Sequence, residues 1–138
     1  MITIYNSKLA KIILWKKFAA VMLFGMIFTT YGKGRISKDD INHEHIHAIQ
    51  WIEIFAVSLF IAIIARYFIQ FSILWLMLSS ITYYALYAVF WAVYKLKGYS
   101  KRQSYHRNPF EIEAFDNEHD MGYISKRSPF AWIKYLMK

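Results

Sequence analysis

Two histidines and a glutamate with metal-site spacing lie in the segment His43-Glu44-His45-Ile46-His47, which matches the pattern HExxH. In a helix, residues four positions apart lie one turn apart on the same face, so His43 and His47 can both bind one metal ion. Glu44 lies about 100° further round the helix, where it can act as general base on a zinc-bound water. His45 points away from this face and is not an expected ligand. The spacing predicts a hydrolytic Zn²⁺ site, since chance placement of these residue types would produce HExxH only about 0.006 times.

The composition describes a single, unusually apolar domain spanning residues 1–138. The chain is 57% hydrophobic and 20% aromatic, whereas ordinary soluble domains are about 45–50% apolar. The absence of cysteine excludes disulfides, thiolate metal sites and cysteine nucleophiles, so any metal must be bound by histidine and carboxylate. The net charge of +8 does not indicate nucleic acid, because the basic residues flank apolar runs. Anionic lipid headgroups are the partner that this pattern favours.

Two apolar runs predict a transmembrane hairpin directly after the HExxH segment. A helix over 38–70 is expected to carry HExxH and to continue into a first span at Ile52–Gln70, with Arg66 reaching the far interface. The second span, over 73–97, includes the uncharged run Ile73–Tyr94, which exceeds the roughly 20 residues that cross a bilayer core. Basic residues precede and follow the hairpin. The positive-inside rule therefore places both termini and the site on the cytoplasmic side of the inner membrane.

The N-terminal region, residues 1–37, contains an apolar run at Phe18–Tyr31 that is too short for a comfortable span. Lys16 and Lys17 precede this run. Its β-branched and aromatic end favours a short strand or an interfacial element within Val21–Tyr31. A third transmembrane helix is the alternative. A strand would offer a free edge that can hold an extended peptide by main-chain pairing.

A catalytic zinc site usually has a third protein ligand, and the chain returns to the same side of the membrane after the hairpin. There, Asn108 before a proline is typical of a helix start and predicts a helix over 109–125. Glu111 and Glu113 lie about 200° apart on such a helix, so only one of them can face the metal. The small residue Ala114 lies beside Glu111 and permits close approach of the HExxH helix. This favours Glu111 as the third ligand, with Glu113 as the alternative.

Several further polar residues allow more than one interpretation. Gln50, one turn beyond His47, either orients a ligand or substrate or is an ordinary residue at the membrane boundary. Glu53 is expected to lie at the interface rather than beside the site. Asp116 and Glu118 are expected to be solvated helix acids. The candidates for stabilising an oxyanion are His119, His106 and Tyr123.

The two predicted site helices together resemble a known family. HExxH on a helix entering the membrane, followed after a hairpin by the stretch EIEA at residues 111–114, resembles the membrane-embedded gluzincin metallopeptidases. Their carboxylate ligand lies in a Glu-x-x-Ala-Asp stretch, whereas Phe115 stands here at the position of the Asp. The wider patterns at 42–50 (NHEHIHAIQ) and 110–118 (FEIEAFDNE) are similar to a group of small HExxH membrane proteins from Bacteroidetes. The resemblance implies peptide hydrolysis but no particular substrate.

Together these observations predict a mainly α-helical integral membrane protein whose residues 126–138 form an amphipathic tail. The predicted function is that of a zinc metallopeptidase acting at the membrane surface, with His43, His47 and Glu111 as ligands. Glu44 is its general base. The expected partners are the lipid bilayer, a protein or peptide substrate and a larger membrane complex, but no nucleic acid. The alternative is a non-catalytic membrane subunit of a larger complex, in which HExxH is structural or vestigial.

Overall fold

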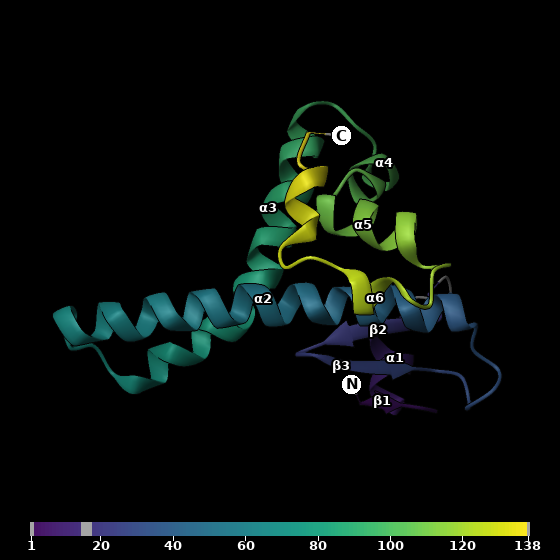
Figure 1. Cartoon of the computed structure of the whole chain (residues 1–138), viewed down its shortest axis with the longest axis horizontal. Coiled ribbons are helices and arrows are strands. Elements are labelled where there is room, and N and C mark those ends of the chain that lie inside the picture. Colours follow the sequence, from purple (N-terminus) through teal and green to yellow (C-terminus); the bar gives the residue numbers. More distant parts are fainter. Residues whose placement is uncertain (1, 15–17, 138) are drawn as a thin grey trace.

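The computed structural model describes residues 2–14 and 18–137 and is mainly helical (Figure 1). One long helix, α2 (Lys38–Ile69), runs through the middle of the molecule. A small N-terminal sheet packs on one side of its first half, and the C-terminal helices pack on the other side. The core between these layers contains Met22, Ala48, Ile54, Tyr83, Phe110 and Trp132. The HExxH segment therefore lies between two layers of the fold.

Helix α2 continues without interruption from the polar HExxH segment into the apolar segment, as predicted. Ser37 caps its start, where the hydroxyl accepts a hydrogen bond from the Asp39 N–H at 3.1 Å. Gln70 ends it in the left-handed conformation. The 32 residues extend about 48 Å at 1.5 Å per residue. Its buried residues all lie between Asn42 and Ile54, so the second half projects beyond the body of the molecule.

The second apolar segment is helical over Ile73–Leu96, close to the predicted 73–97, but it changes direction within this stretch. A 3-10 helix, η1 (Ile73–Ile81), returns along α2, and α3 (Thr82–Leu96) then leaves crosswise to α2 (Figure 1). The two stretches Lys38–Ile69 and Ile73–Leu96 are long and apolar enough to cross a membrane. In the most apolar 18-residue part of each stretch, only 17% and 11%, respectively, is buried in the structure.

Side chains of α2 hold the returning segment η1. The Trp51 Nε1–H donates to the Ser80 carbonyl at 2.9 Å, and the Ser58 hydroxyl donates to the Ser79 carbonyl at 3.2 Å. The Thr82 N–H also binds the Ser79 carbonyl, which continues the 3-10 pattern up to the start of α3. Because these carbonyls are engaged by α2 side chains, the direction of the chain changes where η1 ends.

The N-terminal region forms a three-stranded sheet, which confirms the predicted strand. Strands β1 (Thr3–Ile4), β3 (Met26–Thr29) and β2 (Ala20–Leu23) lie in the order β1-β3-β2, and α1 (Lys8–Ile13) follows β1. The β2–β3 turn contains Gly25 at a positive φ of 75°, where an added Cβ would lie 3.2 Å from the Trp51 ring. The predicted basic flank at residues 16–17 lies outside the described residues. Strand β2 is an edge of the sheet.

Four short helices follow α3: α4 (Lys101–His106), α5 (Pro109–Asn117), α6 (Tyr123–Lys126) and the 3-10 helix η2 (Ala131–Tyr135). Helix α5 begins as predicted, with the Asn108 side chain accepting from the Phe110 N–H. It ends at Asn117 rather than near 125, because the Asn42 amide of α2 donates to three carbonyls at and just after the end of the helix. These carbonyls belong to Asn117, Glu118 and Asp120.

Candidate metal centre

His43, His47 and Glu111 form a buried cluster between α2 and α5, and they could hold a metal ion. The Nε2 atoms of the two histidines lie 3.0 Å apart. The Glu111 carboxylate lies 3.4 Å from each of them, with Oε2 facing His43 and Oε1 facing His47. Helices α2 and α5 pack closely against each other, and the small residues Ala48 of α2 and Ala114 of α5 are fully buried. The structure thus brings together the three ligands that the sequence analysis favoured.

The outer nitrogen of each imidazole has an acceptor as its partner. His43 Nδ1 lies 2.8 Å from Glu118 Oε2, and His47 Nδ1 lies 2.8 Å from Gln50 Oε1. A carboxylate and an amide oxygen accept hydrogen bonds, so we assign the proton of each ring to Nδ1. Both Nε2 atoms then direct lone pairs into the cluster, and a metal site requires this tautomer.

Three acceptor groups therefore converge on one buried point. When both rings are neutral in this tautomer, neither Nε2 atom has a hydrogen to donate, and Glu111 Oε2 has no hydrogen-bond partner among the described residues. Buried polar groups are normally satisfied, and a divalent cation would satisfy all three acceptors at once. Ligand atoms about 2.1 Å from a tetrahedral metal lie about 3.4 Å apart. The separations of 3.0 and 3.4 Å between the ligand atoms fit this geometry.

Glu111 is held in place by its neighbours. The Tyr87 hydroxyl donates to its Oε1 at 2.7 Å, so α3 also contributes to the site. Burial of the carboxyl favours the neutral acid. Positive charge on the adjacent imidazoles of His47 and His43, when they are protonated, outweighs this effect and holds the pKa of Glu111 below its usual range. In turn, the Glu111 carboxylate raises the pKa of His47 to about 9. The group is therefore an ionised, oriented ligand.

Glu113, the alternative ligand, lies away from the histidines. Its carboxylate is completely buried and accepts hydrogen bonds from Arg127, Tyr123 and Gln50. The helical rotation between Glu111 and Glu113 explains the difference, since the two side chains leave opposite sides of α5. Glu113 is a structural partner here, and Glu111 faces the cluster.

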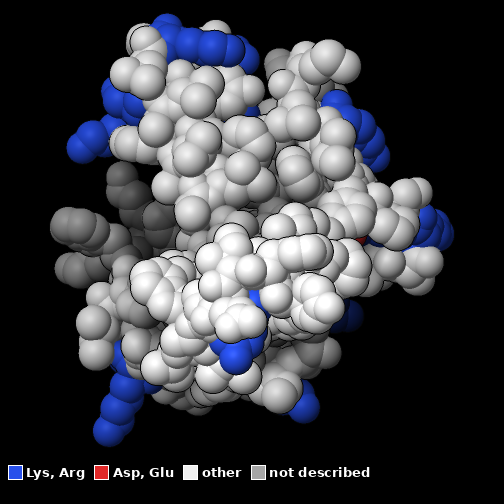
Figure 2. Space-filling model, turned by 90° about the vertical axis from the view of Figure 1, so that its left-hand side faces the viewer, with Lys and Arg blue, Asp and Glu red and all other residues white. Residues whose placement is uncertain are grey.

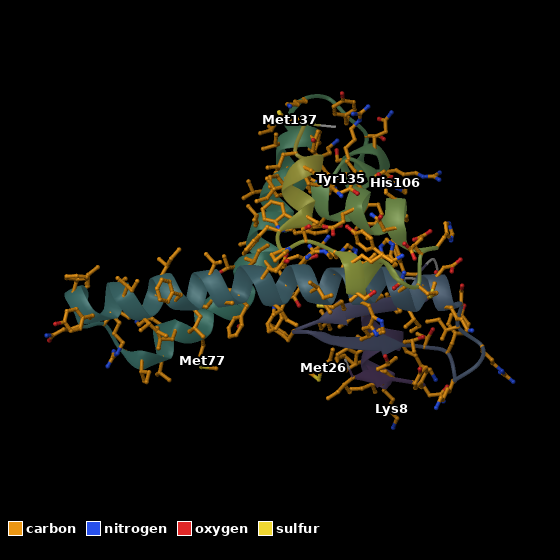
Figure 3. The ribbon with its side chains drawn as sticks, viewed as in Figure 1. Lys8, Met26, Met77, His106, Tyr135 and Met137 are labelled. Carbon is orange, nitrogen blue, oxygen red and sulfur yellow. The ribbon has the colours of Figure 1, made fainter. Side chains whose placement is uncertain are left out.

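Glu44 lies next to His43 on α2 and lines two cavities that flank the cluster. A cavity of about 340 Å³ is lined by aliphatic and tyrosine side chains together with strand β2. A larger cavity of about 900 Å³ opens towards α4, where Lys101 and Arg102 reach its wall. His106, labelled in Figure 3, belongs to this wall. Glu44 also hydrogen-bonds the backbone of Met22.

Several residues have roles that differ from the predicted ones or that the sequence left open. Glu118 was expected to be a solvated acid, but it accepts from His43; its position seven residues after Glu111 places both on one face, a signal that was present in the sequence. Gln50 does orient a ligand, His47. Glu53, expected at the interface, instead binds Arg127 and the Phe130 N–H. The structure also adds Tyr83, Tyr87 and Asn42 to the surroundings of the site.

The oxyanion candidates are distributed differently from the prediction. His119 is exposed and pairs with Asp39 at 2.8 Å, and Tyr123 donates to Glu113. Only His106 lines a cavity that includes Glu44. His45 does not belong to the ligand cluster, as predicted.

No known family model, curated protein or solved structure matches this chain. We therefore infer the function of the protein from the geometry of the site.

Proposed function

We propose that this protein is a zinc-dependent metallopeptidase that works at a membrane surface. The proposal is carried by the convergence of two imidazole lone pairs and one carboxylate, with a second glutamate beside them. His43, His47 and Glu111 would hold the ion, and imidazole with carboxylate is a ligand set that suits zinc. The resemblance to membrane-embedded gluzincins and to the small Bacteroidetes HExxH proteins agrees with this donor set.

The residues around the cluster support hydrolysis. A bound zinc ion supplies Lewis-acid activation of water and of a carbonyl. The Glu44 carboxylate would accept the proton of the attacking water and then donate it to the leaving amine. The two cavities meet at Glu44, so a substrate can extend to both sides of it.

Strand β2 provides a means of holding a peptide. It is one of the two edge strands of the sheet, and its residues line the smaller cavity beside Glu44 and His47. An extended peptide can pair with a strand edge through main-chain hydrogen bonds. The apolar lining of this cavity, which includes Leu14, Leu23 and Tyr84, would accept a large apolar side chain.

We further propose that the second half of α2 and η1 insert into the bilayer of the inner membrane, with the site and both termini on the cytoplasmic side. Figure 2 looks at the molecule from this end and shows a largely uncharged face with a basic side chain near its middle, further Lys and Arg around it and almost no acidic side chain. In Figure 3, Met77 projects from η1 away from the rest of the chain. Such a face suits lipid tails surrounded by anionic headgroups.

Metal content and hydrolysis together test the proposal. We expect the purified full chain in detergent to bind one zinc ion and to cleave peptides from a mixed substrate library. His43→Ala should lose zinc and hydrolysis, whereas Glu44→Gln should keep zinc and lose hydrolysis. The exposed variant Lys8→Ala is the control and should retain both. Zinc binding without hydrolysis of any peptide would favour the non-catalytic membrane subunit instead, and absence of zinc would overturn the proposal.

A further inference from the structure

A buried arginine from the C-terminal segment joins the two helices that carry the ligands. The Arg127 side chain, just after α6, is only 2% exposed. Its Nε donates to Glu113 Oε1 at 2.5 Å, and its two terminal nitrogens donate to the two oxygens of Glu53. Glu53 belongs to α2 and Glu113 to α5. One guanidinium therefore connects both helices, and the Phe130 N–H adds a bond to Glu53 at 2.7 Å.

The network continues from Glu113 to a metal ligand. The Gln50 side-chain nitrogen donates to Glu113 Oε2 at 3.0 Å and to the Phe110 carbonyl at 3.1 Å. Because its NH₂ group faces two acceptors, the Gln50 oxygen must face the opposite way. There it accepts from His47 Nδ1 at 2.8 Å. The orientation of one amide thus decides which nitrogen of His47 carries the proton.

We propose that Arg127 is a positioning residue for the metal site. It holds the Glu113 carboxylate beside Gln50, so that Gln50 presents its oxygen to His47 and the His47 Nε2 lone pair faces the cluster. The inference rests on metal binding, which is part of the proposed function, but it does not require peptide hydrolysis. It makes the C-terminal segment part of a site that HExxH alone does not specify.

If Arg127 only stabilised the fold, its removal would lower stability without acting on the metal site through Gln50. Removing one member of a buried ion pair leaves unpaired charges and destabilises a protein whatever else the pair does. Loss of stability alone therefore does not distinguish the two roles. What distinguishes them is whether the effect of Arg127 on the metal passes through Gln50.

A double-mutant cycle on zinc affinity tests this coupling. Zinc dissociation constants of the full chain in detergent are measured by competition with a chromophoric chelator for Arg127→Met, Gln50→Ala and the double variant. We expect each single variant to weaken binding by about tenfold or more, as is usual for residues that orient a ligand. The double variant should bind zinc no more weakly than Gln50→Ala alone. Additive effects, or an unchanged dissociation constant for Arg127→Met, would overturn the proposal.

Two matched variants separate the parts of the network. Lys126→Met changes the neighbouring exposed side chain and should leave zinc affinity unchanged. Glu53→Gln weakens the contact between the Arg127 guanidinium and α2. It should therefore lower the unfolding temperature while changing the zinc dissociation constant by less than about threefold. A tenfold effect of Glu53→Gln on zinc, equal to that of Arg127→Met, would show that helix docking and not Gln50 carries the effect.

If Arg127→Met does not fold, the zinc-free chain still decides the question. Nitrogen-15 NMR of histidine reports which ring nitrogen carries the proton of a neutral imidazole. The spectra are recorded above pH 9, because the Glu111 carboxylate raises the pKa of His47 to about 9. In the wild type we expect the His47 proton on Nδ1, and in Arg127→Lys, which cannot form the same fork of hydrogen bonds, a shift towards the other tautomer. A wild-type proton on Nε2, or identical His47 spectra in both proteins, would contradict the inference. A chain that binds zinc as described but cleaves no peptide would remove only the proposed hydrolysis.

Discussion

The two halves of α2 have the same backbone conformation and opposite surroundings. In the first half, polar side chains are buried, including Asn42, His43, His47 and Gln50. In the second half, large apolar side chains are exposed. These exposed residues are Val57, Phe60, Ile61, Ile63, Ile64, Tyr67, Phe68 and Ile69. Both halves invert the usual arrangement of polar surface and apolar core.

The comparison shows that the two inversions have different causes. Each buried polar group in the first half has a partner on another element: Asn42 on the carbonyls after α5, His43 on Glu118, and Gln50 on Glu113. Among the described residues, the apolar groups of the second half lie beside η1, and most of them remain exposed. The first half is organised by the protein, and we propose that lipid surrounds the second.

The largest expected effect comes from a charge in the second half. Ile61 is 59% exposed on α2, and a lysine near the middle of a membrane helix costs about 2.5–3.5 kcal/mol. Ile61→Lys should therefore be released from membranes by alkaline carbonate much more readily than the wild type. Zinc affinity in detergent should stay unchanged.

The control for this experiment is Ile12→Lys, an exposed position on α1 that should have no effect on extraction. If Ile61→Lys is extracted no more than the wild type, the second half of α2 does not lie in the bilayer. Lipid would then not account for its exposed apolar side chains.

An intermediate effect is expected from Glu118 in the layer that covers the first half. Glu118→Gln weakens the acceptor of the His43 Nδ1–H and allows an amide nitrogen to face the ring instead. We expect zinc to bind about tenfold more weakly, with little change in membrane extraction. Isothermal titration with zinc measures this. Asp120→Asn, two residues later on the same loop, should bind zinc like the wild type; equal affinities for all three proteins would show that Glu118 does not orient His43.

The smallest effect is expected where the two halves meet. Ser58→Ala removes the hydroxyl that donates to the Ser79 carbonyl and should cost about 1 kcal/mol of unfolding free energy. Trp51→Phe keeps the stacking on Phe55 and loses the indole donor to Ser80, so a similar loss is expected. Denaturant unfolding in detergent measures both. Zinc affinity should be unaffected, and a large loss of zinc binding would mean that η1 and the metal site are coupled.

The sequence predicted those features that depend on local patterns. The length of α2, the start of α5 at Asn108 and the strand before residue 31 follow from capping residues, apolar runs and β-branched residues, which act over a few positions. Helical geometry and the small residue Ala114 favoured Glu111 as the third ligand but left Glu113 open as the alternative. The structure places Glu111 in the cluster accordingly.

Features that depend on contacts between distant segments were not predictable in the same way. The change of direction between η1 and α3 depends on two α2 side chains that bind carbonyls more than twenty residues later in the chain. Arg127 was assigned to an amphipathic tail, yet it lies buried between two glutamates. Whether such a group is buried and paired depends on which acids the fold brings to it.

The sequence by itself determined that two histidines share one face of a helix, that a glutamate adjoins them, and that an apolar hairpin follows. Helical periodicity and hydrophobic length are local properties and can be counted along the chain. Only the tertiary structure decided which carboxylate completes the HExxH cluster and which nitrogen of each imidazole faces it. Hydrogen-bond partners from α5 and the loop after it set those orientations, and their positions are fixed by packing across the fold.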